Sequence, residues 1–186
     1  MAFTVSEIKT ALSKGGARPS LFEISGLSTG APQMYYIRGG QLPGSNLGVL
    51  TTNWRGRPVK YPGVKTYDPW TATILNDDGA FRTEIYDWIQ RMSGDHLNVR
   101  SGAVGAHLGK FVTTDYKDIT IKQLGKQGNT TFTYTLQNAF PTALGDIALD
   151  WGTEGFQEYS VTFRYDTFIA GAGDGTTKHI ADAVVV

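Results

Sequence analysis

Apolar and polar residues alternate along several segments of this chain, a pattern typical of strands with one dry and one solvated face. The alternation is clearest over residues 156–168, where Tyr159, Val161, Phe163 and Tyr165 share one side. Residues 69–75 repeat it with Trp70, Ala72 and Ile74. Shorter segments with strand character are residues 20–24, 34–42, 47–54, 58–61, 116–124 and 131–138. The pattern predicts a mainly β protein.

A helical period is clearest in one segment, residues 80–92. Its apolar residues fall on one face of a helix and are Phe81, Ile85, Trp88, Ile89 and Met92. Asn76, Asp77 and Asp78 precede it and are expected to cap it. A short helix with Ser6 as its N-cap is expected near the N-terminus.

Many strands beside one long helix predict an antiparallel β-sandwich or barrel with a flanking α-helix. We expect residues 1–170 to form one domain. Residues 171–186 begin glycine-rich and are expected to be a flexible C-terminal extension.

Composition excludes several classes of protein. The chain has no cysteine, so disulfides, thiolate metal sites and cysteine nucleophiles are excluded. A run of about 18 apolar residues, which a membrane span needs, is missing, and the N-terminus does not resemble a signal peptide. We therefore expect no membrane partner and synthesis in the cytoplasm. The formal net charge of zero disfavours a DNA-binding protein, which is normally strongly basic.

The neutral total hides an uneven distribution of charge. Between residues 7 and 65, eight bases face two acids, whereas between residues 146 and 166 five acids face one base. One interpretation is chance together with solvated faces. The other is that copies of the chain dock basic surface against acidic surface, which would fix their orientation.

A search for catalytic or ligand-binding motifs finds none. His96, His107 and His179 lie far apart, without metal-ligand spacing, and the nucleophile pattern Gly-x-Ser-x-Gly is absent. The glycine-rich run 171–175 lacks the lysine that ends a phosphate loop. The sequence thus predicts no catalytic residue, no cofactor and no metal.

Several segments, in order, resemble the tail tube family of contractile-tailed bacteriophages. They are ARPSLFEI (17–24), RGRPVKY (55–61), YDPWTATILND (67–77), the helix with Asp87-Trp88, NAFPT (138–142), LDW (149–151) and EYSVTFRYD (158–166). Each segment is weak alone, but together they cover residues 5–168. The fold is also similar to that of siphovirus, type VI secretion and R-type pyocin tubes.

The resemblance implies a structural protein of the virion tail, assembled in the host cytoplasm, whose copies close into hexameric rings. Stacked rings would form the inner tube through which DNA passes during ejection, without sequence-specific binding. The implied partners are further copies of the chain, the tail sheath, the baseplate or tube initiator, the tail terminator and the tape measure protein. We also expect acidic and neutral polar residues to dominate the lumen, because a basic lumen would retain DNA.

The resemblance also implies that the hairpin spanning residues 47–61 reaches from one ring to the next. The residues expected at this interface are Leu47, Val49, Leu50, Trp54, Arg55, Arg57 and Lys60. The alternative is an ordinary surface hairpin whose apolar residues cover the chain's own core.

Three alternative functions stay open. The tube of a phage-like injection system or pyocin would have the same motifs. A carbohydrate-binding β-sandwich would expose Trp54, Trp70, Trp88 and Trp151 as an aromatic platform. An enzyme would need a pocket with converging polar groups.

Overall fold

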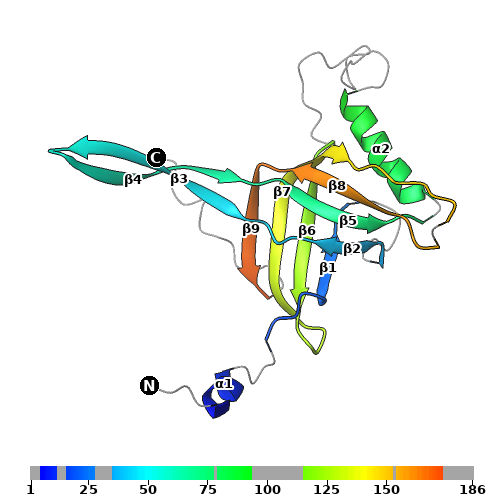
Figure 1. Ribbon diagram of the computed structural model, residues 1–186, viewed down its shortest axis with the longest axis horizontal. Helices are drawn as coiled ribbons and strands as arrows, with labels where there is room; N and C mark the ends of the chain where they lie inside the picture. The colour runs from blue at the N-terminus through cyan, green and yellow to red at the C-terminus, as the bar shows by residue number, and fades with distance from the viewer. Residues whose placement is uncertain are drawn as a thin grey trace.

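The computed structural model describes residues 5–11, 16–27, 35–77, 79–93, 115–152 and 154–173. Both helices and all nine strands of this part of the chain appear in Figure 1. In chain order they are α1 (Val5–Ala11), β1 (Phe22–Ser25), β2 (Ile37–Gly40), β3 (Ser45–Trp54), β4 (Arg57–Tyr67), β5 (Trp70–Leu75), α2 (Ala80–Ser93), β6 (Lys117–Leu124), β7 (Thr130–Leu144), β8 (Glu158–Arg164) and β9 (Thr167–Ala172).

The body is one bent antiparallel sheet. Its strand order is β1-β6-β7-β8-β5-β2, with β9 paired to β7. The long strand β7 belongs to both halves, because residues 132–137 pair with β9 whereas residues 140–144 pair with β8. The strands β9, β7, β6 and β1 run across the direction of β8, β5 and β2 (Figure 1). This confirms the predicted antiparallel β architecture, and the strands do not close into a complete barrel within one chain.

A bulge at Asn138 lets β7 serve both halves. Ile119 pairs with Leu136 and Lys117 with Ala139, so β7 holds one residue more than β6 over this stretch. Asn138 has a φ of 54°, a left-handed conformation that asparagine tolerates better than most residues. The extra residue keeps Leu136 and Ala139 both buried on the core side.

The core lies between the two halves and α2. The apolar side chains predicted to be dry on β5 and β8 are all buried. Phe163 lies between two tryptophans, with ring centroids 5.6 Å from Trp70 and 6.1 Å from Trp88. Trp88 comes from α2 and donates its indole N–H to the Asp115 carbonyl. The apolar helix face predicted from the sequence therefore packs against the sheet.

Three predicted strand boundaries were wrong. The segment 156–168 is not one strand, because the chain turns at residues 165–166 between β8 and β9. Strand β4 does not end before Pro62 but continues to Tyr67. Proline is tolerated there because β4 belongs to a two-stranded sheet, in which each strand has an unpaired edge. Strand β2 covers only residues 37–40 of the predicted 34–42.

Two predicted caps were also wrong. Helix α1 begins at Val5, so Ser6 lies inside it and accepts a hydrogen bond from the Thr10 hydroxyl through its carbonyl. The side-chain amide of Asn76 donates to Gln157, and its oxygen, which a cap would use as acceptor, has no hydrogen-bond partner among the described residues, so Asn76 does not cap α2. Asp78 lies outside the described residues.

Strand β9 extends to Ala172, two residues past the predicted end of the domain. The Gly173 N–H still donates to the Thr131 carbonyl, at 3.0 Å. Residues 174–186 lie outside the described part of the chain, so the extension stays a prediction.

Candidate assembly surface

Strands β3 and β4 form a long hairpin that projects from the body (Figure 1). They constitute a separate two-stranded sheet. Trp54 pairs with Arg57, so the connecting turn consists of Arg55 and Gly56, with φ of 48° and 81°. Two positive φ values in a two-residue loop define a type I′ turn, whose twist matches that of the paired strands. The turn geometry therefore fixes the pairing and twist of the two strands. The body of the protein does not cover the hairpin.

The hairpin exposes large apolar side chains along most of its length. All four apolar residues predicted for the interface are exposed, so they do not cover the chain's own core. Sequence reasoning missed three further exposed apolar residues, Val59, Tyr61 and Val64. The signal for two of them was present, because a two-residue turn at Arg55-Gly56 pairs Tyr61 with Leu50 and Val59 with Thr52.

The register divides these residues between two faces of the ribbon. Leu50 pairs with Tyr61, and Thr52 pairs with Val59. Because alternate residues of a strand share a face, one face carries Leu50, Trp54, Arg57, Val59 and Tyr61. The opposite face carries Leu47, Val49 and Lys60. The structure thus brings the predicted residues to one hairpin but to both of its sides, with Arg55 at the tip.

The charge of the hairpin is entirely basic. Residues 45–67 contain Arg55, Arg57, Lys60 and Lys65 and no acid. Among the described residues, the three bases nearest the tip make no ion pair. Exposed apolar groups next to unpaired cations are typical of a surface that a partner covers.

The base of the hairpin is anchored to the body. Lys65 Nζ lies 5.2 Å from the Tyr67 ring and 5.7 Å from the Phe168 ring. The Thr167 hydroxyl donates a 3.0 Å hydrogen bond to the Tyr67 oxygen, and this bond, aided by Lys65, lowers the pKa of Tyr67. The hairpin is therefore fixed where it leaves the sheet and free at its tip.

The sheet also has unpaired edges. Within the described residues, β1 pairs only with β6, and β9 pairs only with β7. Their free N–H and C=O groups can accept strands from another copy. On β7, the outward positions that alternate with the buried Leu136 include the uncharged polar residues Thr131, Thr135 and Gln137.

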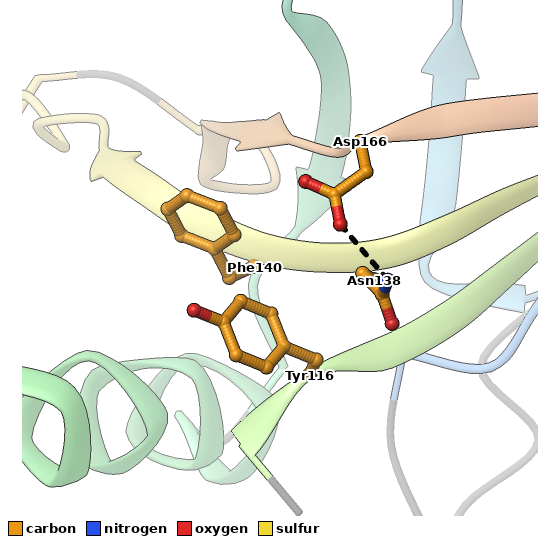
Figure 2. A pocket seen from close by; sticks show the side chains of 4 residues that line it. All are labelled: Tyr116, Asn138, Phe140 and Asp166. Atoms are coloured by element: carbon orange, nitrogen blue, oxygen red, sulfur yellow. Dashed lines mark hydrogen bonds between the residues drawn. The ribbon is translucent and has the colours of Figure 1, made fainter. Parts of the chain in front are cut away.

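The described residues offer little for catalysis. A pocket of about 290 Å³ is lined by Tyr116, Asn138, Phe140 and Asp166 (Figure 2). Its single carboxylate already accepts a hydrogen bond from Asn138, and no general base lies opposite. The described residues contain no cluster of histidine, aspartate and glutamate that could hold a metal. The three histidines lie outside the described residues.

The ionisable groups of Tyr159, which is buried, and Lys117, which is half-buried, contact side chains of α2. Burial raises the pKa of Tyr159 to about 12, against the opposing effect of Arg82. Arg82 lies over the Tyr159 ring at 4.9 Å. Burial lowers the pKa of Lys117, whose ammonium lies 4.6 Å from the Trp88 ring centre and 3.9 Å from Glu84. Both groups support the packing of α2 rather than line a cleft.

The four tryptophans do not form a sugar-binding platform. Trp70 and Trp88 are buried in the core, whereas Trp54 and Trp151 are exposed on different parts of the chain. None of the helices in the described part of the chain is long and apolar enough to span a membrane.

Comparisons with known proteins point to one family. The chain is 24% identical over 166 residues to the tail tube protein gp19 of Enterobacteria phage T4, covering 87% of this chain and 97% of that protein. It is 25% identical over 126 residues to the tail tube protein of Serratia phage KSP90, covering 66% of each chain.

Solved structures with the same fold include two parts of an extracellular contractile injection system in the extended state. Its sheath/tube terminator has a TM-score of 0.63 at 21% identity and covers 84% of this chain and 97% of that one. Its sheath-tube complex has a TM-score of 0.57 at 21% identity and covers 92% and 99%. Residues 21–171 match the family described as phage tail tube protein. The chain belongs to the phage tail tube protein family.

Proposed function

We propose that copies of this protein close into hexameric rings, and that stacked rings form the inner tube of a contractile tail. Proteins of this family are structural components of the virion tail. During ejection, the genome would pass through the lumen. The role is assembly and conduction, and we assign no catalytic step to any residue.

The observation that carries this proposal is the incomplete sheet. Strands β1 and β9 lie at the two edges of one half of the sheet, and each pairs on one side only within the described residues. When β1 of one copy lies beside β9 of the next, the half-sheets of neighbouring copies join into a continuous barrel. Joining removes exposed edges that otherwise promote aggregation.

The outward face of this half-sheet has the chemistry that a lumen needs. Ile24, Ile119 and Ile121 face the core, so the alternate positions of β1 and β6 face outward. Those outward positions are Glu23, Ser25, Asp118, Thr120 and Lys122, and Glu23 pairs across the strands with Lys122. A nearly neutral surface would let DNA slide instead of holding its phosphates. A tube structure with a basic lumen would contradict this assignment.

The hairpin is proposed to join one ring to the next. Its exposed apolar residues and unpaired bases need a partner, and its length lets it reach beyond its own ring. Replacing both Arg55 and Arg57 with glutamate should block polymerisation while leaving the monomer folded. Normal tubes formed by this variant would refute the inter-ring role.

The remaining partners follow from the proposed role. A tail tube would contact the sheath along its outer surface, the baseplate or initiator at one end and the terminator at the other. The tape measure protein and then DNA would occupy the lumen. Co-sedimentation of assembled tubes with purified sheath protein tests the first of these contacts. The tube of a phage-like injection system has the same architecture, and the genes beside this one would distinguish the two.

Negative-stain electron microscopy of purified protein over a range of concentrations tests the central proposal. Hollow rings or striated tubes of uniform width are expected. The same preparation should be repeated with the baseplate, because a nucleus can limit assembly. Monomers under both conditions, confirmed by sedimentation velocity, would contradict the proposal.

A further inference from the structure

The connection between β7 and β8 exposes three large apolar side chains. Leu149, Trp151 and Phe156 are 80%, 107% and 87% exposed. Their apolar surface is almost wholly in water, although the same chain buries two other tryptophans in its core. Three large apolar side chains this exposed within eight residues of the chain indicate a surface that a partner covers.

The connection is also uniformly acidic. Residues 145–157 contain Asp146, Asp150 and Glu154 and no base. Asp150 accepts a 3.0 Å hydrogen bond from the Gly152 N–H, which shapes the loop. Asp146 and Glu154 make no ion pair with any residue that the structure describes. The connection thus offers exposed apolar groups and the carboxylates of Asp146 and Glu154. It is complementary in charge to the hairpin, which is all basic and also exposes apolar groups.

Both ends of the connection are held to the body. The Arg82 guanidinium donates to the Gly145 carbonyl at 3.1 Å, and the Gly145 N–H donates to the Ser160 carbonyl at 2.7 Å. At the other end, Asn76 donates its backbone N–H and its side-chain amide to Gln157, at 2.8 and 2.9 Å. These anchors fix where the apolar residues between them are presented.

The hairpin and the connection lie on opposite sides of the body. In Figure 1 the hairpin extends to the left, whereas the yellow to orange connection runs on the right, beside α2. One copy therefore cannot bring its own hairpin onto its own connection. Two different surfaces of one chain that match each other form a head-to-tail contact, which generates rings or open stacks.

We propose that the β7–β8 connection is the surface onto which the β3–β4 hairpin of a second copy docks. The hairpin face with Leu50, Trp54, Val59 and Tyr61 covers Leu149, Trp151 and Phe156, while Arg55 and Arg57 lie near Asp146 and Glu154. This inference rests on the proposed tube assembly and names the receiving side of that contact.

Charge reversal on each side, alone and combined, tests the contact. We expect the pair D146K and E154K, and separately the pair R55E and R57E, each to raise the concentration needed for assembly by about tenfold or more, since like charges would then face each other. The fourfold variant should return to within about threefold of the wild type, because the attraction is restored with reversed signs. The single changes D87K and K126E, at exposed sites outside both surfaces, should assemble normally.

Disulfide trapping gives a second readout, because the chain has no cysteine. Mixing the R57C and E154C variants under mild oxidation should give cross-linked dimers, and the double variant should give a ladder of oligomers. Each single variant alone should stay unlinked. The E154C variant paired with K126C serves as the control and should not cross-link.

The outcomes separate this inference from the proposed function. If the wild type forms no rings or tubes, either alone or with the baseplate, the proposed function fails. If the wild type assembles but the D146K and E154K pair assembles equally well and the mixed cysteine variants do not cross-link, the docking site is wrong while the tube role stands. Circular dichroism of each variant establishes that a loss of assembly is not a loss of folding.

Discussion

The side-chain amide of Asn138 donates a 2.9 Å hydrogen bond to Oδ2 of Asp166, and this bond joins the bulge of β7 to the turn between β8 and β9 (Figure 2). The Asn138 N–H also donates to Asp118 Oδ1, at 3.1 Å. One residue thus connects three segments at the point where the sheet bends. A left-handed φ places its side chain and its N–H where both bonds can form.

Replacing Asn138 with alanine should lower the free energy of unfolding by about 2 kcal/mol. Alanine loses the side-chain bond to Asp166 and tolerates a left-handed φ less well than asparagine. Glycine at the same position should cost less than alanine, because glycine adopts this φ freely. Urea denaturation measures both variants. Equal stability of the alanine variant and the wild type would show that the bulge does not depend on this residue.

Ionisation of Tyr159 should lower the free energy of unfolding at alkaline pH. Its pKa in the folded protein, about 12, is above the ordinary 10.0. Between these values the unfolded chain releases a proton that the folded chain retains, so the free energy of unfolding falls as pH rises through this window. The Tyr159 hydroxyl is buried without a hydrogen-bond partner among the described residues. Tyr159→Phe should therefore be at least as stable near neutral pH and should lose less stability at high pH.

Urea denaturation at neutral pH and near pH 11 checks this expectation. Tyr61→Phe, in the exposed hairpin, is the matched control and should keep the alkaline loss. Burial also raises the pKa of Tyr165, so a smaller alkaline loss will remain in the Tyr159 variant. An unchanged alkaline loss would contradict the assignment to Tyr159.

Assembly should shift tryptophan fluorescence to shorter wavelength. Trp54 and Trp151 are 69% and 107% exposed, whereas Trp70 and Trp88 are each 1% exposed. Only the first two can lose water when copies associate. Trp54→Phe and Trp151→Phe should each reduce the shift, and the double variant should nearly abolish it. A full shift in the double variant would place the interface elsewhere.

Arg55→Asn should separate hairpin stability from assembly. Arginine occupies a left-handed position where asparagine is favoured, as in the Asn-Gly sequence of type I′ turns. Amide hydrogen exchange in β3 and β4 should therefore slow. Assembly should weaken, because the tip loses a cation. An Arg55→Lys variant, which retains the charge, should assemble as the wild type does. Stronger assembly by Arg55→Asn would show that turn geometry, not charge, limits docking.

Some features of the hairpin could be predicted from the sequence, and others could not. Local pattern predicted the two strands of the hairpin, 47–54 and 58–61, with a turn between them. The expectation that the apolar residues of β3 face a neighbour came from the resemblance to tail tube proteins. The continuation of β4 past Pro62 did not, because proline normally ends a paired strand and only the sheet shows that this strand has a free edge. The division of Leu47 and Leu50 between opposite faces also required the register.

Local signals in the amino-acid sequence are enough for the helix with Phe81 and Trp88 on one face and for the alternation that buries Val161 and Phe163. These depend on the periods of helix and strand, which neighbouring residues define. Tertiary structure alone decided that β7 bends at Asn138 to serve both halves, that β9 departs from β8, and that the hairpin and the β7–β8 connection face opposite ways. Those features depend on contacts between residues far apart in the chain, and no local period encodes them.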